Sequence, residues 1–125
     1  MILVDTSVWV HHLRFGDKTL FALLHSADVL GHPFVLGELA LGNLRQHSLV
    51  LRSLKDLPQA SLATNTEVLQ FIDRQKLFGT GIGYVDVHLL ASVVLTAGAT
   101  LWTRDKRLQI TAEKLGMGWT AGRQQ

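Results

Sequence analysis

The sequence predicts an α/β fold, a three-layer sandwich in which a parallel sheet of four or five strands carries helices on both faces. One observation is that short, purely apolar runs such as Ile2–Val4 are typical of strands buried on both faces. Another is that longer segments with helical spacing separate these runs. Strands that alternate with helices favour a parallel sheet, because a crossover helix returns the chain to the same edge.

The first half of the chain predicts two strands and four helices. The expected strands cover residues 2–4 and 29–30, and the expected helices cover residues 7–14, 18–26, 33–44 and 49–54. Asp5 ends the first strand, and Thr6 lies near the N-cap of the first helix. Apolar side chains recur at helical spacing from Leu20 to Leu24. Pro33 favours the first turn of the third helix.

The second half of the chain predicts three helices and two strands. The expected helices cover residues 66–77, 84–96 and 105–116, and the expected strands cover residues 99–102 and the edge strand 117–119. The helix over 84–96 is nearly all apolar and ends at Gly98, a usual C-terminal residue. Thr103 or Asp105 caps the last helix. A glycine-rich loop precedes the apolar helix, with Gly79, Gly81 and Gly83.

Length and composition bound the class of protein. We expect a single domain spanning residues 1–125, because 125 residues leave little room for a second one. Hydrophobic residues make up 47%, which fills a core and leaves apolar surface for a partner. The chain has no cysteine, which fits a reducing cytoplasm, and no run of about 18 apolar residues that would predict a membrane span. The net charge of +2 permits a polyanionic partner without requiring one.

Two acids follow predicted strands. Asp5 ends the first strand, and Asp105 lies just beyond the strand over 99–102. Ligands bind at the carboxyl ends of strands in open parallel sheets, so both acids belong on the same edge. We expect the two carboxylates to approach each other if their strands are neighbours.

Two further acids are predicted to lie on the apolar stripes of helices. Glu38 shares a helix face with Phe34, Val35 and Leu41, and Asp86 precedes a nearly all-apolar run. A lone ionised carboxylate on such a stripe costs several kcal/mol unless it is compensated. A divalent cation compensates several acids at once, and Mg²⁺ and Mn²⁺ prefer oxygen ligands. The pattern therefore indicates a metal site.

Each acid also has a purely structural interpretation. Asp5 and Asp105 are good helix caps. Glu38 has Arg45 within reach as an ion-pair partner, and Asp86 lies where a helix dipole favours negative charge. The basic residues are poorly placed to neutralise all four acids together, because most lie elsewhere in the chain, at Arg14, Lys18, Arg45, Arg52, Lys55, Arg74 and Lys76.

Four segments resemble a known family. The runs "ILVDTSVWV", "GELALGNL", "GIGYVDVHLLAS" and "LWTRDKRL" resemble, in order, the PIN-domain ribonucleases, and within them the VapC-type toxins of bacterial type II toxin–antitoxin pairs. The resemblance implies a PIN-like fold and an acidic pocket that holds Mg²⁺ or Mn²⁺. Its acidic positions fall on Asp5, Glu38, Asp86 and Asp105. Its hydroxyl positions, which orient carboxylates or water, fall on Thr6, Ser7 and Thr103.

The resemblance also implies partners. It implies a homodimer and a small antitoxin that blocks the pocket and binds operator DNA, so that this chain meets the operator only through the antitoxin complex. The expected substrate is RNA. Basic side chains beside Asp105 are candidates to seat its phosphates, namely Arg104, Lys106 and Arg107, with Arg14 and Lys18 as further candidates on the first helix.

The expected reaction is hydrolysis of an RNA phosphodiester to 5′-phosphate and 3′-hydroxyl ends. We expect Asp5, Asp86 and Asp105 to hold the metal, and Glu38 to orient or deprotonate water or to bind a second ion. Three alternatives stay open. They are a metal-free nuclease with a histidine pair, a Mg²⁺-dependent phosphatase with Asp5 as nucleophile, and a binding protein whose acidic pocket holds metal or a partner's arginine. The phosphatase is disfavoured because Ser7 stands where such enzymes carry a second aspartate.

Overall fold

The computed structural model describes residues 1–121, in which a sheet of three parallel strands is flanked by seven helices. The strands are β1 (Ile2–Val4), β2 (Val29–Leu30) and β3 (Thr100–Trp102), in the order β2-β1-β3. The helices are α1 (Thr6–Phe15), α2 (Lys18–His25), α3 (Pro33–Ala40), α4 (His47–Lys55), α5 (Asn65–Gln75), α6 (Tyr84–Leu95) and α7 (Lys106–Lys114). The α/β class and the parallel sheet are confirmed. The last four residues of the predicted domain lie outside the described residues.

The predicted strand count of four or five is wrong. The segments beside the two outer strands make one bridge each, between Gly31 and Gln59 and between Leu101 and Gly118. Pro58 explains part of this, because its carbonyl accepts from Gly31 but proline has no N–H to extend a ladder. The predicted edge strand over 117–119 is therefore a single bridge beside β3.

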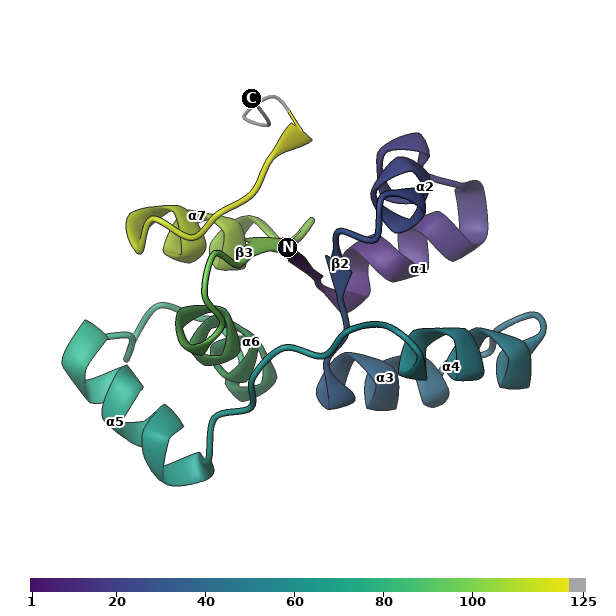
Figure 1. The fold of residues 1–125 in the computed structure, drawn as a ribbon. Helices are drawn as coiled ribbons and strands as arrows, with labels where there is room; N and C mark the ends of the chain where they lie inside the picture. The colour runs from purple at the N-terminus through teal and green to yellow at the C-terminus, as the bar shows by residue number, and fades with distance from the viewer. Residues whose placement is uncertain (122–125) are drawn as a thin grey trace.

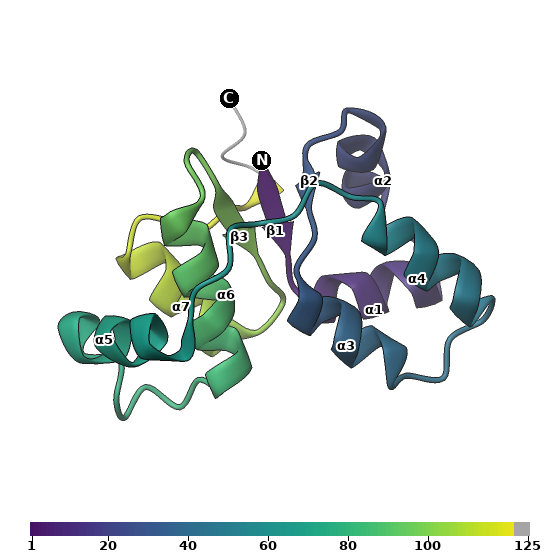
Figure 2. The ribbon, with the colours of Figure 1, turned by 60° about the horizontal axis from the view of Figure 1, so that its bottom comes forward.

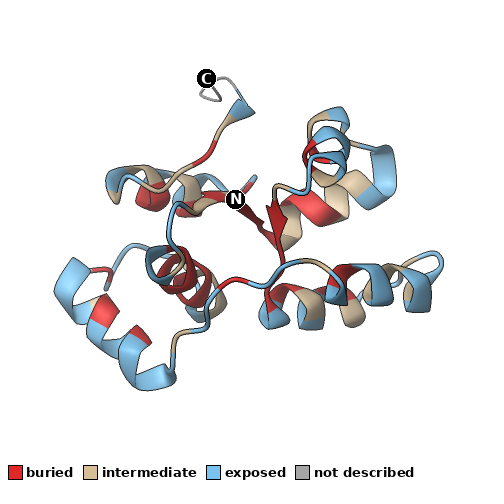
Figure 3. Ribbon diagram, viewed as in Figure 1, coloured by how far each residue is buried: buried red, intermediate tan, exposed pale blue. Residues whose placement is uncertain are grey.

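The strands lie at the centre with helices grouped on either side. In Figure 1 and Figure 2, α1 to α4 gather beside β2, and α5 to α7 gather beside β3. Figure 3 shows the buried residues concentrated in the strands and in α6. Every residue of α6 from Val87 to Val93 is buried, and all of them except His88 and Ser92 are apolar. Within residues 1–121, no helix has the length and apolar character needed to cross a membrane.

Polar side chains at the helix ends explain several boundaries. Asp17 and Thr64 accept backbone N–H groups at the starts of α2 and α5, and Thr64 forms a capping box with Glu67. The helix predicted over 33–44 ends earlier, at Ala40, where the ring of His47 lies 2.7 Å from the last carbonyl oxygen. Gly42 follows within two residues, and glycine disfavours continuation of a helix.

Candidate active site

Parallel pairing of β1 and β3 brings two distant segments together. Val4 lies opposite Trp102, and the Asp5 N–H donates to the Trp102 carbonyl at 2.9 Å. The residue that follows each strand therefore points to the same edge of the sheet. There the Thr103 hydroxyl donates to Oδ2 of Asp5 at 2.7 Å.

Asp5 is buried and held by two hydroxyl groups. The residue is 5% exposed, and Ser7 Oγ donates to the same Oδ2 at 2.7 Å. The capping interpretation of Asp5 is not supported, because its side chain makes no capping hydrogen bond to α1. Ser7 and Thr103 in turn accept the backbone N–H groups of Arg104 and Asp105, each at 3.0 Å. A chain of hydrogen bonds therefore fixes the orientation of the carboxylate.

Asp105 does act as a helix cap. Its Oδ1 accepts the backbone N–H of Leu108 at 2.9 Å at the start of α7. The capping interpretation therefore holds for one of its oxygens. The bond also fixes where this exposed carboxylate lies relative to the end of β3.

Glu38 is exposed, so the prediction that it lies on an apolar stripe is wrong. The buried stripe of α3 runs through Val35 and Leu39, whereas Leu41, beyond the end of the helix, is 91% exposed. The Glu38 side chain accepts a hydrogen bond of 2.6 Å from the Thr6 hydroxyl at the start of α1. This bond ties α3 to the strand end that carries Asp5.

Asp86 is half-buried in the first turn of α6. Burial first, and then the negative charges of Asp5, Asp105 and Glu38, raise its pKa to about 6, against a hydrogen bond from the Gly83 backbone that lowers it. All three other acids are therefore close enough to repel Asp86. The structure brings together four acids from four segments, called here the acid cluster, which consists of Asp5, Glu38, Asp86 and Asp105.

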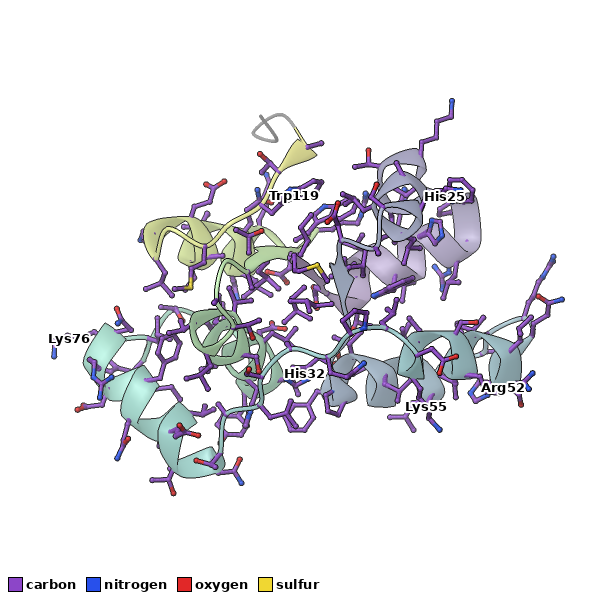
Figure 4. All side chains as sticks on the ribbon, viewed as in Figure 1. His25, His32, Arg52, Lys55, Lys76 and Trp119 are labelled. Atoms are coloured by element: carbon purple, nitrogen blue, oxygen red, sulfur yellow. The ribbon has the colours of Figure 1, made fainter. Side chains whose placement is uncertain are left out.

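Basic side chains do not neutralise the acid cluster. Within residues 1–121, none of its four carboxylates forms an ion pair with a lysine or arginine. Figure 4 shows Arg52, Lys55 and Lys76 at the outer margins of the molecule. In the same part of the chain, no group of three or more acidic, histidine or cysteine side chains is arranged so that it could hold a metal ion. The cluster therefore gathers like charge without a basic partner, and its carboxylates do not surround a single ion position.

The predicted RNA-binding residues lie in two separate regions of the molecule. Arg104, Lys106 and Arg107 are exposed around Asp105, at the edge where the acid cluster lies. Arg14 lies apart from them, where with Arg45 it lines a groove of about 550 Å³ that no member of the acid cluster lines.

Two buried histidines are a feature that the sequence analysis did not identify. His32 is 3% exposed and His88 is 4% exposed. His32 Nδ1 accepts the Phe34 N–H at 3.0 Å, so its neutral ring carries the proton on Nε2, 3.0 Å from Ser92 Oγ. His88 Nε2 lies 3.2 Å from Asn65 Oδ1. These two rings are called here the imidazole cluster, and Figure 4 shows His32 toward the centre of the molecule.

Both rings of the imidazole cluster are held uncharged. Burial first, and then the nearby imidazole of His88, lower the pKa of His32 to about 4. Burial also lowers the pKa of His88. The Phe34 ring packs 5.3 Å from His32 and 4.7 Å from His88, between centroids. A signal for their burial was present, because His88 stands inside the apolar run of α6 and His32 directly follows the apolar end of β2.

Comparison with known proteins gives one consistent relationship. No protein-family model matches the chain. The chain is 49% identical over 117 residues to a protein named Ribonuclease VapC32 from Mycobacterium tuberculosis, in strain CDC 1551 / Oshkosh and in strain ATCC 25618 / H37Rv. The alignment covers 94% of this chain and 94% of each relative.

Proposed function

This chain belongs to the VapC family of PIN-domain ribonucleases, and from that premise we propose that it is a metal-dependent endoribonuclease, the toxin of a toxin–antitoxin pair. The observation that carries the proposal is the acid cluster, in which three carboxylates lie close enough to Asp86 to add to the effect of its burial, and together they raise its pKa to about 6. Crowded like charges of this kind are typical of sites that bind a cation.

We assign the metal to Asp5, Asp86 and Asp105, and we propose Mg²⁺ or Mn²⁺. The donors fit such an ion because all are hard carboxylate oxygens without a basic partner among residues 1–121. When bound, the ion supplies Lewis-acid chemistry: it acidifies water and neutralises charge on the phosphate oxygens.

The side chains of the site have separate tasks in this proposal. Ser7 and Thr103 hold Asp5 in one orientation, so its geometry is set before substrate arrives. Glu38, exposed and bonded to Thr6, orients or deprotonates the attacking water or binds a second ion. The water oxygen attacks phosphorus, the bond to O3′ breaks, and a proton passes to O3′. The products therefore carry 5′-phosphate and 3′-hydroxyl ends.

The family also suggests the partners. We propose that a small antitoxin blocks the acid cluster, inserts an arginine there, and brings the complex to operator DNA. We propose that the chain forms a homodimer and acts in the cytoplasm. Large exposed apolar side chains support association with another chain, because Leu41 is 91% exposed and Phe15 is 75% exposed.

Induced expression in cells tests the proposal. The parent protein should arrest growth and create discrete new RNA 5′ ends, whereas Asp86→Asn should do neither. Purified parent should lose activity in a chelator and regain it with Mg²⁺ or Mn²⁺. A binding protein that cleaves nothing would give no new ends with either chain. Products with 2′,3′-cyclic phosphates, or cleavage that persists in the chelator, would contradict the mechanism.

A further inference from the structure

The guanidinium group of Arg107 lies against the backbone of Gly81. A Cβ added to Gly81 would stand 2.8 Å from Arg107 Nη1 and 3.3 Å from its Cδ and Cζ atoms. Real Cβ contacts are essentially never shorter than 3.0 Å. The guanidinium therefore occupies the space that any other residue at position 81 would fill.

The segments that meet here carry two members of the acid cluster. Arg107 lies two residues beyond Asp105, in the first turn of α7. The loop of Gly81 continues to Gly83, which hydrogen-bonds Asp86, and then enters α6. Arg107 thus bridges the start of α7 and the loop ahead of α6, the two segments that carry Asp105 and Asp86.

The guanidinium group is free to bind an anion. Arg107 is exposed, and within residues 1–121 its guanidinium forms neither an ion pair nor a hydrogen bond. Its N–H donors form a planar fork that matches a phosphate in bidentate geometry. Packing on Gly81 restricts the side chain, so less conformational entropy is lost when a phosphate binds.

The negative charges of the acid cluster repel a phosphodiester that approaches it, so a nearby positive charge is needed to bind the phosphate. We propose that Arg107, held across Gly81, seats a phosphate of the RNA beside the acid cluster, an inference that rests on the ribonuclease function proposed above. Arg107 is the binding residue, and Gly81 is a positioning residue that acts through it.

The same loop supplies a matched control. Gly79 has a φ of +77° and Gly81 a φ of +83°, so alanine is strained to a similar degree at both positions. A Cβ at Gly79 would meet nothing within 4 Å, whereas a Cβ at Gly81 meets Arg107. Gly79→Ala therefore reproduces the backbone strain of Gly81→Ala without displacing the guanidinium.

The test measures RNA binding apart from cleavage. A short fluorescein-labelled RNA of mixed sequence is titrated in a chelator with proteins that all carry Asp5→Asn. Arg107→Gln should weaken binding about tenfold, and the slope of log affinity against log salt should shrink by about 0.7, the change expected when one phosphate is no longer neutralised. Gly81→Ala displaces the guanidinium but keeps its charge, so it should weaken binding less than Arg107→Gln, and Gly79→Ala should match the parent. Gly81→Ala should add nothing to Arg107→Gln.

Each result decides the inference separately from the proposed function. Parent affinity and parent salt slope in Arg107→Gln would overturn it, even if the parent cleaves RNA. Equal losses in Gly79→Ala and Gly81→Ala would overturn the role of Gly81, because strain alone would then explain both. If Gly81→Ala does not fold, Arg107→Lys replaces it. Lysine keeps the charge without the planar fork, so binding should fall between parent and Arg107→Gln, and parent-like binding would rule out the bidentate seat. A parent that does not cleave RNA would instead refute the proposed function.

Discussion

The acid cluster and the imidazole cluster both contain buried or half-buried titratable side chains, but these are stabilised differently. Both nitrogens of His32 have hydrogen-bond partners, and burial keeps the ring neutral. Asp86 faces three carboxylates, and within residues 1–121 no basic side chain pairs with it. The imidazole cluster is therefore complete as it stands, whereas the acid cluster lacks a positive partner. Burial of a titratable group is thus weaker evidence for function than an uncompensated charge.

The largest difference between the clusters should appear in RNA cleavage. Asp5→Asn should reduce the rate of RNA cleavage by about 10³-fold or more. The residues of a catalytic unit act together, so the loss of one removes most of the effect. His88→Gln should cleave RNA at nearly the parent rate, because glutamine can still hydrogen-bond Asn65. Metal-free Asp5→Asn should be as stable as the parent or more stable, since a repulsive charge is removed. Rates of RNA hydrolysis and urea unfolding curves measure both effects.

Comparable cleavage by Asp5→Asn and the parent would contradict the assignment of the acid cluster. A large loss of cleavage in well-folded His88→Gln would instead move the chemistry toward the imidazole cluster.

A pair of hydroxyl deletions should separate the clusters by kind of effect. Thr103→Val removes a hydrogen bond to Asp5 and should lower cleavage about 10–100-fold, as the loss of a group that orients a metal ligand does. Ser92→Ala removes the partner of His32 and should cost about 1–3 kcal/mol of unfolding free energy. Cleavage per folded molecule should not change in Ser92→Ala. If Ser92→Ala lost more cleavage activity than its loss of folded protein explains, the imidazole cluster would contribute to cleavage and not only to stability.

The two clusters should give opposite pH dependence of stability. The folded protein binds more protons than the unfolded chain at Asp86 between pH 3.8 and about 6, so this group makes stability fall as pH rises. It binds fewer protons at His32 between about pH 4 and pH 6.5, so that group makes stability rise with pH. The two slopes oppose each other in the parent. Asp86→Asn should therefore show a steeper rise in unfolding midpoint across this range.

Thermal or urea unfolding of both proteins across that range measures the slopes. Identical profiles for Asp86→Asn and the parent would mean that folding does not raise the pKa of Asp86.

The smallest effect should come from adding a metal ion without RNA. Mg²⁺ or Mn²⁺ at ten times its dissociation constant should stabilise the native protein by about 1.4 kcal/mol and raise Tm by a few degrees. The shift should be larger above pH 6, where Asp86 is ionised, and absent in Asp86→Asn. Ser92→Ala is the control, because its acid cluster is intact. An equal shift in Asp86→Asn would place the ion elsewhere.

Sequence reasoning succeeded where backbone topology decides the outcome. Asp5 and Asp105 were predicted to meet because parallel strands end at one edge, and pairing of β1 with β3 brings these segments together. It failed for Glu38, because tertiary packing decides which face of α3 is buried. The buried face of α3 runs through Val35 and Leu39, so Glu38 reaches the cluster from an exposed position.

The sequence also did not show which distant residues form hydrogen bonds with each other. The bond between His32 and Ser92 joins residues that are 60 positions apart. The apolar neighbours of both residues signal their burial, but no local pattern shows that they pair, so only the folded chain reveals this bond. The predicted number of strands was wrong for a related reason. Apolar composition does not show whether a neighbouring segment makes one bridge or a full ladder.

The single bridges at the two outer strands have a consequence for how copies of this protein can associate. Gly31 uses its N–H with Pro58 and its carbonyl with Ala60, and Leu101 uses the same two groups with Met117 and Trp119. Exposed strand edges otherwise act as templates for another chain, the usual start of edge-to-edge aggregation. Because these positions are already occupied, another copy cannot continue the sheet there. Association at those positions has to proceed through helices and side chains, so two copies should join and separate without exchanging backbone hydrogen bonds.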